Sequence, residues 1–250
     1  MGDKSGIEWT DATWNPTTGC DQVSPGCDHC YALTLAKRLK AMGQPKYQRD
    51  GDPRTSGPGF ALTVHEDALD VPRAWRAPRR VFVNSMSDLF HPKVPEDFVA
   101  RVFDVMADTP RHQYQLLTKR PKRAASLASR LPWPDNVWLG TSIESNAYVD
   151  RADQLRPVPA SVRFLSCEPL LGPLPDLNLE GIDWVIVGGE SGPGARSMDE
   201  AWVLDLRDRC RNAKVPFFFK QWGGRTPKAG GRQLKGRTWN QMPKVKARAA

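Results

Sequence analysis

Short apolar runs alternate with amphipathic stretches along most of the chain, and this alternation constrains its fold more than any other feature. The runs are rich in β-branched and aromatic residues and lack alternating polar positions, which is typical of strands buried on both faces of a parallel sheet. The eight runs that we predict as strands are Ile7–Trp9, Ala61–His65, Val81–Asn84, Gln115–Thr118, Val137–Thr141, Arg163–Ser166, Trp184–Val187 and Phe217–Lys220.

The stretches between most of these strands have the 3.6-residue periodicity of helices that pack on a sheet. Eight strands connected in this way predict an α/β protein with a (β/α)8 TIM-like barrel, complete or partly open. A doubly wound open sheet is the alternative. The helices predicted from the periodicity are Tyr31–Ala41, Pro95–Ala107, Lys122–Arg130, Ala147–Leu155 and Met198–Asn212.

Residues 1–223 contain all of these elements, and we expect them to form the barrel as one domain. Residues 224–250 carry eight of the 36 Lys and Arg residues and no Asp or Glu. The other 28 basic residues equal the 28 acidic ones in number, so this basic C-terminal extension carries the whole formal charge of +8. Such an extension attracts polyanions such as nucleic acid, and a merely solvated tail is the alternative.

The N-terminal residues, MGDKSGIEWT, contain no apolar run of the kind that forms a signal peptide. No stretch approaches the roughly 18 consecutive apolar residues that cross a bilayer. We therefore expect a cytoplasmic protein without a membrane partner, and the sequence does not indicate its oligomeric state. Thiols stay reduced in the cytoplasm, where clustered cysteines bind metal more often than they form disulfides.

Three of the five cysteines lie within "GCDQVSPGCDHCYA", with the spacing C-x6-C-x2-C. Closely spaced thiolates hold zinc or an iron–sulfur cluster. A structural zinc site needs a fourth ligand, for which His65, His91, Cys167 and Cys210 are the candidates. A [4Fe–4S] cluster held by three cysteines instead leaves its fourth iron open to a chelating ligand. The candidate metal ligands in this cysteine loop, residues 20–30, are Cys20, Cys27 and Cys30.

Polar residues follow the predicted strands, where a barrel carries its functional groups. The same residue types also cap helices, which is the structural alternative for each of them. The motif "GGESGPGAR" contains glycines that let a ligand approach the backbone, or that simply form a turn. We predict cofactor contacts at Thr141, Ser142, Glu144, Glu168, Gly188, Gly189 and Glu190, with Lys119, Arg120, Arg196 and Lys220 near them.

Three cysteines after the first strand of such a barrel resemble the radical S-adenosylmethionine (SAM) superfamily. The usual spacing there is C-x3-C-x2-C with an aromatic residue before the last cysteine, whereas this chain has x6 and His29 in those positions. The Gly-Gly-Glu element of that superfamily follows its second strand, whereas Gly188, Gly189 and Glu190 follow the seventh predicted strand here. Its role in binding the methionine amino group is therefore not transferred to these residues.

A closer resemblance covers almost the whole chain, from "IEWTDATWNPTTGC" and "SPGCDHCYA" through "VNSMSDLFHP", "RFLSCEPLLGPL" and "WVIVGGESGPGAR" to "FFFKQWGG". These blocks are similar to a phage-associated family of uncharacterised three-cysteine proteins related to radical SAM enzymes and to spore photoproduct lyase. The resemblance implies a [4Fe–4S] cluster on Cys20, Cys27 and Cys30, and SAM as a second cofactor. It also implies a reductant such as a flavodoxin or ferredoxin.

The leading functional hypothesis is an enzyme that generates a 5′-deoxyadenosyl radical, with a nucleic acid as the favoured substrate class. In this hypothesis Cys167, between Ser166 and Glu168, is a candidate hydrogen-atom donor, and its alternatives are a fourth cluster ligand and a buried packing residue. Two other functions stay open at this point. One is a non-catalytic [4Fe–4S] redox or accessory protein, and the other is a zinc-stabilised module that binds nucleic acid.

Overall fold

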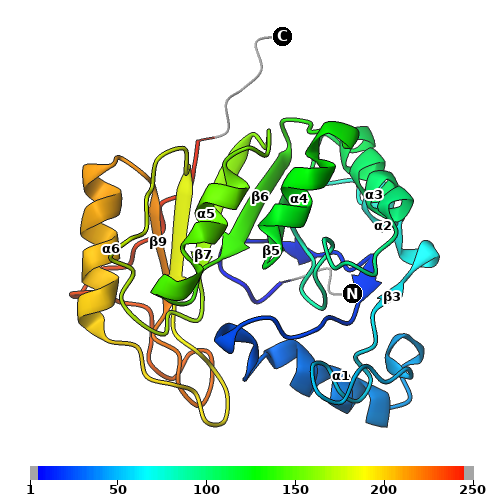
Figure 1. The fold of residues 1–250 in the computed structure, drawn as a ribbon, viewed down its shortest axis with the longest axis horizontal. Coiled ribbons are helices and arrows are strands. Elements are labelled where there is room, and N and C mark those ends of the chain that lie inside the picture. The colour runs from blue at the N-terminus through cyan, green and yellow to red at the C-terminus, as the bar shows by residue number, and fades with distance from the viewer. Residues whose placement is uncertain (1–4, 245–250) are drawn as a thin grey trace.

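The computed structural model describes residues 5–244, which form a curled sheet of seven parallel strands with helices packed against it (Figure 1). The strands lie side by side in the order in which they occur in the chain, and every neighbouring pair is parallel. They are β1 (Ala12–Thr13), β4 (Arg80–Val83), β5 (Gln113–Thr118), β6 (Val137–Ser142), β7 (Val162–Cys167), β8 (Trp184–Gly188) and β9 (Phe217–Gln221).

This order identifies the architecture as a partly open relative of the TIM barrel. In a doubly wound sheet the strand order reverses at a switch point, and here it never reverses, so that alternative is wrong. Parallel strands joined in sequence by right-handed crossovers carry their connections on one face of the sheet. The α/β class and the partly open form of the barrel are thus confirmed.

Two of the eight predicted strands are wrong. Residues Ile7–Trp9 form a turn, closed by a hydrogen bond from the amide of Thr10 to the carbonyl of Ile7. Of residues 61–65 only β3 (Thr63–Val64) is a strand, and it pairs antiparallel with β2 (Thr17–Thr18) outside the seven-stranded sheet. The first strand of the sheet is β1 instead, which is too short to give a hydrophobic pattern.

The helices follow the predicted positions closely, with one short helix that the periodicity missed. The α-helices are α1 (Tyr31–Ala41), α2 (Val71–Ala74), α3 (Glu96–Asp108), α4 (Pro121–Leu127), α5 (Asp150–Leu155) and α6 (Glu200–Asn212). Single 3-10 turns are η1 (Pro25–Cys27), η2 (Pro45–Tyr47), η3 (Glu66–Ala68), η4 (Ala128–Arg130) and η5 (Asn146–Tyr148). The stretch after β7, residues 168–182, contains neither helix nor strand.

Helix α3 illustrates how the outer layer forms. Glu96 and Asp97 occupy its first turn, where carboxylates interact favourably with the helix dipole. Its buried residues recur every three or four positions, so one face is apolar and packs on the sheet. Helices α3, α4, α5 and α6 all contribute to the main hydrophobic core, whereas α1 packs through Ala32 and Ala36 on a separate small cluster below the sheet (Figure 1).

The inner face of the sheet is divided into an aromatic part and a polar part. Trp184 lies at the centre of the aromatic part, with its ring 5.6–6.2 Å from the rings of Trp9, Trp138, Phe164 and Phe218. Trp9, which was predicted to lie in a strand, thus packs inside the curled sheet and adds no strand to it. Further along the strands, toward their carboxyl ends, the inner face carries small and polar residues, which leave room for a site.

Residues 224–244 pack back on the edge strand β9. The amide of Phe219 donates to the carbonyl of Trp239 at 2.9 Å, and the side chains of Leu234 and Trp239 are buried in the main core. Lys246 and Arg248 of the predicted basic extension lie outside the described residues. Within residues 5–244, no helix has the length and apolar character that crossing a membrane requires.

Candidate functional site

A cavity of about 620 Å³ lies at the carboxyl ends of the parallel strands, on the inner face of the sheet. Its volume is in the range of ordinary ligand sites. The cysteine loop forms one wall, and Cys20, Cys27 and Cys30 all line the cavity. The loop therefore covers the rim where a barrel of this type carries its functional groups.

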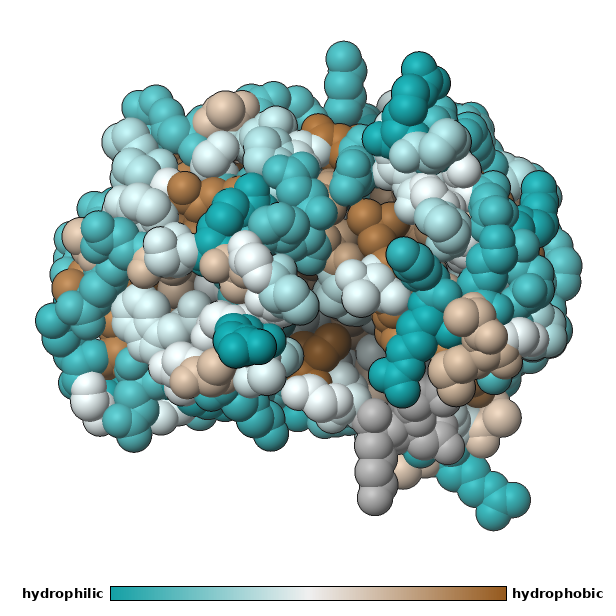
Figure 2. Space-filling view, turned by 90° about the horizontal axis from the view of Figure 1, so that it is seen from below, coloured by the Kyte–Doolittle hydropathy of each residue, from teal (hydrophilic) through white to brown (hydrophobic). Residues whose placement is uncertain are grey.

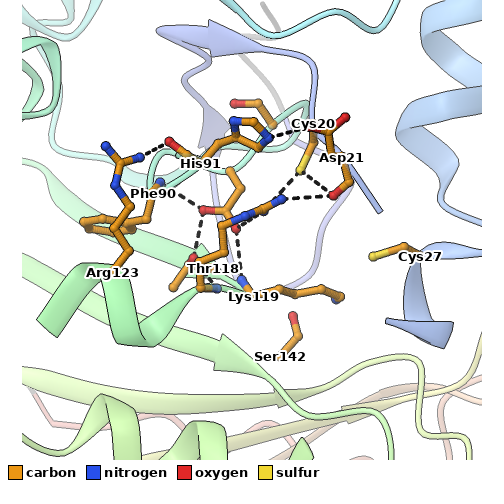
Figure 3. Close-up of polar contacts among 12 residues, drawn as sticks. Cys20, Asp21, Cys27, Phe90, His91, Thr118, Lys119, Arg123 and Ser142 are labelled. Atoms are coloured by element: carbon orange, nitrogen blue, oxygen red, sulfur yellow. Dashed lines mark hydrogen bonds and ion pairs between the residues drawn. The ribbon is translucent and has the colours of Figure 1, made fainter. Parts of the chain in front are cut away.

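The thiol of Cys20 accepts a hydrogen bond from Arg120, which forms a buried ion pair with Asp88. Arg120 lies two residues after β5. It donates from Nη1 to Asp88 Oδ2 at 2.9 Å and to Cys20 Sγ at 3.4 Å, and from Nη2 to the carbonyl of Asp21 at 3.0 Å. Asp88 is fixed in turn by Thr118 and by backbone amides. Figure 3 shows the thiol of Cys20 within this network and Cys27 set apart from it. Burial raises the pKa of the Cys20 thiol to about 12.

Asp21 fixes the same end of the cysteine loop to its surroundings. Its Oδ2 lies 2.9 Å from His91 Nε2, and its Oδ1 accepts hydrogen bonds from Thr55 and Ser56. Sequence reasoning missed this carboxylate, although it directly follows the first metal-ligand candidate. It also considered His91 only as a zinc ligand. The polar run after β4, "NSMSDLFHP", was the available signal because it supplies both His91 and Asp88.

The other end of the loop is held by the motif that follows β8. Glu190 accepts hydrogen bonds from the side chain and the backbone amide of Arg196, and its Oε2 lies 2.9 Å from His29 Nδ1. Arg196 also donates to the carbonyl of Pro25 and pairs with Asp28. Burial opposes ionisation of Glu190, but these hydrogen bonds outweigh it and lower its pKa to about 2. Glu190 and Arg196 thus form a clamp on residues 25–29.

Two glycines permit close approaches around the cavity. A Cβ on Gly26 would lie 3.1 Å from the carboxyl carbon of Glu144, so this loop residue rests directly on that side chain. A Cβ on Gly188 would lie 2.6 Å from Glu168 Oε1. The backbone at Gly188 therefore leaves space for the Glu168 carboxylate, which pairs with Lys220 at 3.0 Å and accepts a hydrogen bond from Ser166.

Lys119 is an unpaired cation in the cavity wall. Within residues 5–244 its ammonium group makes no hydrogen bond and no ion pair. In the view of Figure 3 its side chain extends between Cys27 and Ser142. Lys119 and Cys30 both line the cavity, and the positive charge of Lys119 opposes the burial that raises the pKa of the Cys30 thiol. An anionic group of a ligand beside Cys30 would find its counter-charge here.

The cavity contains part of the predicted site. Of the cofactor contacts, Ser142, Glu168, Gly189 and Glu190 line it. Four other predicted residues do not line it: Thr141, Glu144, Gly188 and Cys167. Thr141 donates to the carbonyl of Thr118, and Glu144 is fully buried with Oε2 2.9 Å from Arg151 Nη1.

Cys167 lies on the helix-facing side of β7, away from the cavity. It is 0% exposed and belongs to the main hydrophobic core, as does Cys210. Burial raises the pKa of the Cys167 thiol far above its ordinary value. Side chains alternate between the two faces of a strand, so Ser166 points into the cavity and Cys167 away from it. This position agrees with the packing alternative and not with a hydrogen-atom donor in the cavity.

The donor set matches the expected cluster in number and in chemistry, because three thiolates can each bind one of its iron atoms. Across residues 5–244, no three His, Cys, Asp or Glu side chains are grouped as ligands of one ion. Cys20, Cys27 and Cys30 instead face a shared cavity, each as a free thiol. A cluster takes each cysteine on a different iron atom, so its ligands need not converge on one point. The three thiols lose their protons when they bind metal.

Two solved structures are weakly similar to this chain, and both are variants of spore photoproduct lyase. One is a single-residue variant, with a TM-score of 0.44 and 10% identity. The other, a variant with a dinucleoside spore photoproduct, has a TM-score of 0.44 and 11% identity. Each match covers 71% of this chain and 55% of the other, so the chain spans about half the length of these proteins.

The comparison with curated proteins gave no match. A match that covers nearly the whole chain comes from a family profile, which is described as "Protein of unknown function (DUF5131)" and aligns with residues 4–243. That description mentions neither phages nor cysteines, so the association with phages stays a prediction. Because the match spans the sheet, the cysteine loop and the clamp together, the chain belongs to the DUF5131 family.

Proposed function

We propose that this protein is an iron–sulfur enzyme of the radical SAM type. One observation carries the proposal: three free thiols line a single cavity at the carboxyl ends of a curled parallel sheet. In this proposal Cys20, Cys27 and Cys30 hold a [4Fe–4S] cluster, and SAM binds beside it. When bound, these cofactors supply the one-electron chemistry that converts SAM to methionine and a 5′-deoxyadenosyl radical.

The residues of the cavity are suited to orient a zwitterionic ligand such as SAM. Lys119 offers an unpaired cation for a carboxylate, and Glu168 offers a carboxylate for an amino group. Ser142 and Ser166, on the neighbouring strands β6 and β7, provide hydroxyl groups on the same inner face. The aromatic cluster around Trp184 closes the amino-terminal end of the curled sheet and limits the access of water from that side.

A nucleic acid is the substrate class that we propose. Lys228 lies in the cavity wall and belongs to the C-terminal segment that carries eight basic residues and no acid. A polyanion lying along this segment would bring its bases toward the cavity mouth. The same charges would make binding weaken steeply as salt is raised.

The two alternative functions make different predictions about the cavity. A non-catalytic [4Fe–4S] protein would bind a cluster without affinity for SAM, although the unpaired Lys119 favours an anionic ligand. A zinc-stabilised module needs four ligands around one ion. The part of the chain that the structure describes, residues 5–244, offers no such group. The radical SAM proposal accounts for the open cavity as well as for the thiols.

The proposal is tested by anaerobic reconstitution with iron and sulfide, followed by calorimetric titration of SAM. The expected result is about four iron and four sulfide per chain, with SAM bound and cleaved to 5′-deoxyadenosine after reduction with dithionite. A variant with Cys210 changed to Ala is the matched control because this thiol lies outside the cavity. Zinc without sulfide, or a reconstituted cluster with no affinity for SAM, would overturn the proposal.

A further inference from the structure

The exposed large hydrophobic side chains of residues 5–244 all lie on the cysteine loop or on α1, the helix that follows it, and its C-cap residue. They are Val23 in the loop, Tyr31 and Leu35 in α1, and Met42 at the end of α1, with exposed fractions of 38–60%. Isolated exposed hydrophobics are common on any protein surface. Their concentration on 20 consecutive residues, beside the three cysteines, is not a scattered distribution.

These side chains form an apolar ridge with a basic border. Tyr31, Leu35, Arg38 and Met42 are spaced by four, three and four residues, so they share one face of the helix. Residues 31–49 contain five Lys or Arg residues and no Asp or Glu. Three of the basic residues, Lys37, Arg38 and Arg49, have no ion-pair partner within the described residues, and the first two of them lie on α1. We call this surface, made of Val23, Tyr31, Leu35, Lys37, Arg38 and Met42, the α1 ridge. Two of its residues, Val23 and Tyr31, also line the cavity, so the ridge begins at the cavity rim.

The α1 ridge is separate from the rest of the protein core. Only Ala32 and Ala36 of α1 are buried, and they pack on Phe60 and Met86 instead of on the sheet. Figure 2 views the molecule from the side on which α1 lies and shows small apolar patches among hydrophilic ones, with no broad apolar face. Such a mixed surface is typical of a transient protein contact and not of a permanent one.

We propose that the α1 ridge is the docking site for an acidic, low-potential electron-carrier protein. The inference rests on the proposed function, in which the cofactor held by Cys20, Cys27 and Cys30 must accept one electron from outside. Cys30 is the residue that begins α1, so a carrier seated on the ridge would lie next to the cysteine loop. In the transfer one electron leaves the reduced carrier and is accepted at the cluster, and no bond is formed or broken.

The composition of the ridge favours a protein over a nucleic acid. A nucleic acid is recognised through phosphates and stacked bases. The aliphatic side chains of Leu35 and Met42 contribute to neither contact, but they suit the apolar centre of a protein interface. Lys37 and Arg38 at the border complement acidic side chains, as in interfaces that are steered by charge.

The experiment is a calorimetric titration of the full chain, without a cluster, with an oxidised acidic flavodoxin at about 50 mM ionic strength. We expect Arg38→Glu to raise the dissociation constant about tenfold and Leu35→Ser about fivefold. Lys122→Glu is the matched charge reversal, because Lys122 is exposed on α4 in the outer layer. It should leave the constant unchanged. Raising the ionic strength to about 300 mM should weaken binding to the wild type more than binding to Arg38→Glu, which has lost part of the attraction.

Three kinds of result would overturn the docking proposal. The first is that the flavodoxin does not bind the wild type, or that it binds Leu35→Ser, Arg38→Glu and Lys122→Glu with equal affinity. Another is a duplex or single-stranded DNA that binds through the same two residues while the flavodoxin does not. The third is a dimer of the chain that the two ridge variants dissociate. The cluster content of the protein does not depend on the carrier, and dithionite replaces the carrier in the SAM-cleavage assay. These two measurements therefore test the proposed function separately.

Discussion

The five cysteines fall into two groups with different surroundings. The sequence alone had placed Cys167 among the candidate site residues, together with the three cysteines of the loop. Cys20, Cys27 and Cys30 are partly exposed in a cavity, whereas Cys167 and Cys210 are 0% exposed in the core. Cys167 ends a strand beside the cavity, but its side chain points to the helices because faces alternate along a strand. The difference teaches that the face on which a strand-end residue lies, and not its place in the chain, decides whether it belongs to the site.

The largest expected effect tests this difference directly. Cys27→Ser should reduce the iron bound after reconstitution by about tenfold or more, because one ligand of the cluster is lost. Cys210→Ala should retain the full iron content and lower the free energy of unfolding by about 1 kcal/mol through a small cavity in the core. Iron and sulfide analysis and chemical denaturation measure the two outcomes. Equal iron loss in both variants would contradict the division of the cysteines.

A second comparison pairs two glutamates, one in the clamp and one on the surface. Glu190 is 5% exposed and holds His29 and Arg196, whereas Glu200 forms an exposed pair with Lys235. Glu190→Gln should destabilise residues 25–29 by about 1–2 kcal/mol, because charged hydrogen bonds to a partly exposed Arg196 are weakened. Amide hydrogen exchange of these residues is the measurement, and Glu200→Gln is the control that should leave it unchanged.

The same clamp makes a prediction about pH. The pKa of Glu190 is about 2 in the folded chain, below its usual 4.5, so its ionised form stabilises the fold. That stabilisation is fully present above about pH 4.5 and is lost as the pH falls toward 2. The difference in free energy of unfolding between the wild type and Glu190→Gln should shrink over this range. A difference that is constant from pH 6 to pH 2, in about 1-unit steps, would contradict the role given to the carboxylate.

Most helices and strands could be predicted well from the sequence, because hydrophobic periodicity is a local property. Helix α1 occupies the predicted residues, and the ends of the strands from β4 to β9 lie within two residues of their predicted ends. Residues 7–9 and 61–65 misled the prediction for a physical reason. Ile7 and Trp9 are apolar because they pack against the inner face of the sheet, and this tertiary contact has the same composition as a strand.

The site was predictable only in part, for a related reason. Cys20, Cys27 and Cys30 could be recognised from their spacing, and strand-end polarity identified Ser142 and Glu168 correctly as cavity residues. The clamp could not be predicted, because it joins Glu190 to His29 across 161 positions. Glu190, predicted as a cofactor contact, does line the cavity, and its hydrogen bonds also hold the cysteine loop. Contacts of that range depend on the curvature of the sheet, which no local pattern encodes.

A third comparison pairs two lysines that are three positions apart. Lys119 directly follows β5 and lines the cavity without an ionic partner in the described residues, and Lys122 is exposed on α4. Lys119→Gln should raise the dissociation constant of SAM about fivefold, because an anionic group of the ligand loses its counter-charge. Lys122→Gln should leave the constant unchanged. Calorimetry on the cluster-loaded protein measures both, and an unchanged affinity in Lys119→Gln would exclude Lys119 from the ligand site.

The smallest expected effect concerns two glycines with different neighbours. A methyl group on Gly188 would meet the carboxylate of Glu168, whereas one on Gly172 would meet no atom within 4 Å. Gly188→Ala should therefore displace Glu168 from Lys220 and weaken SAM binding about twofold to threefold. It should cost little stability, since only the end of a flexible side chain moves. Gly172→Ala should change neither property.

Unchanged SAM affinity in Gly188→Ala would mean that Glu168 acts only as the ion-pair partner of Lys220. A large loss of stability would mean instead that the backbone of β8, and not the Glu168 side chain, gives way to the methyl group. The two results differ in their readouts, because the first appears in calorimetry and the second in denaturation. The glycine pair thus separates ligand binding from packing at the point where the aromatic and polar parts of the inner face meet.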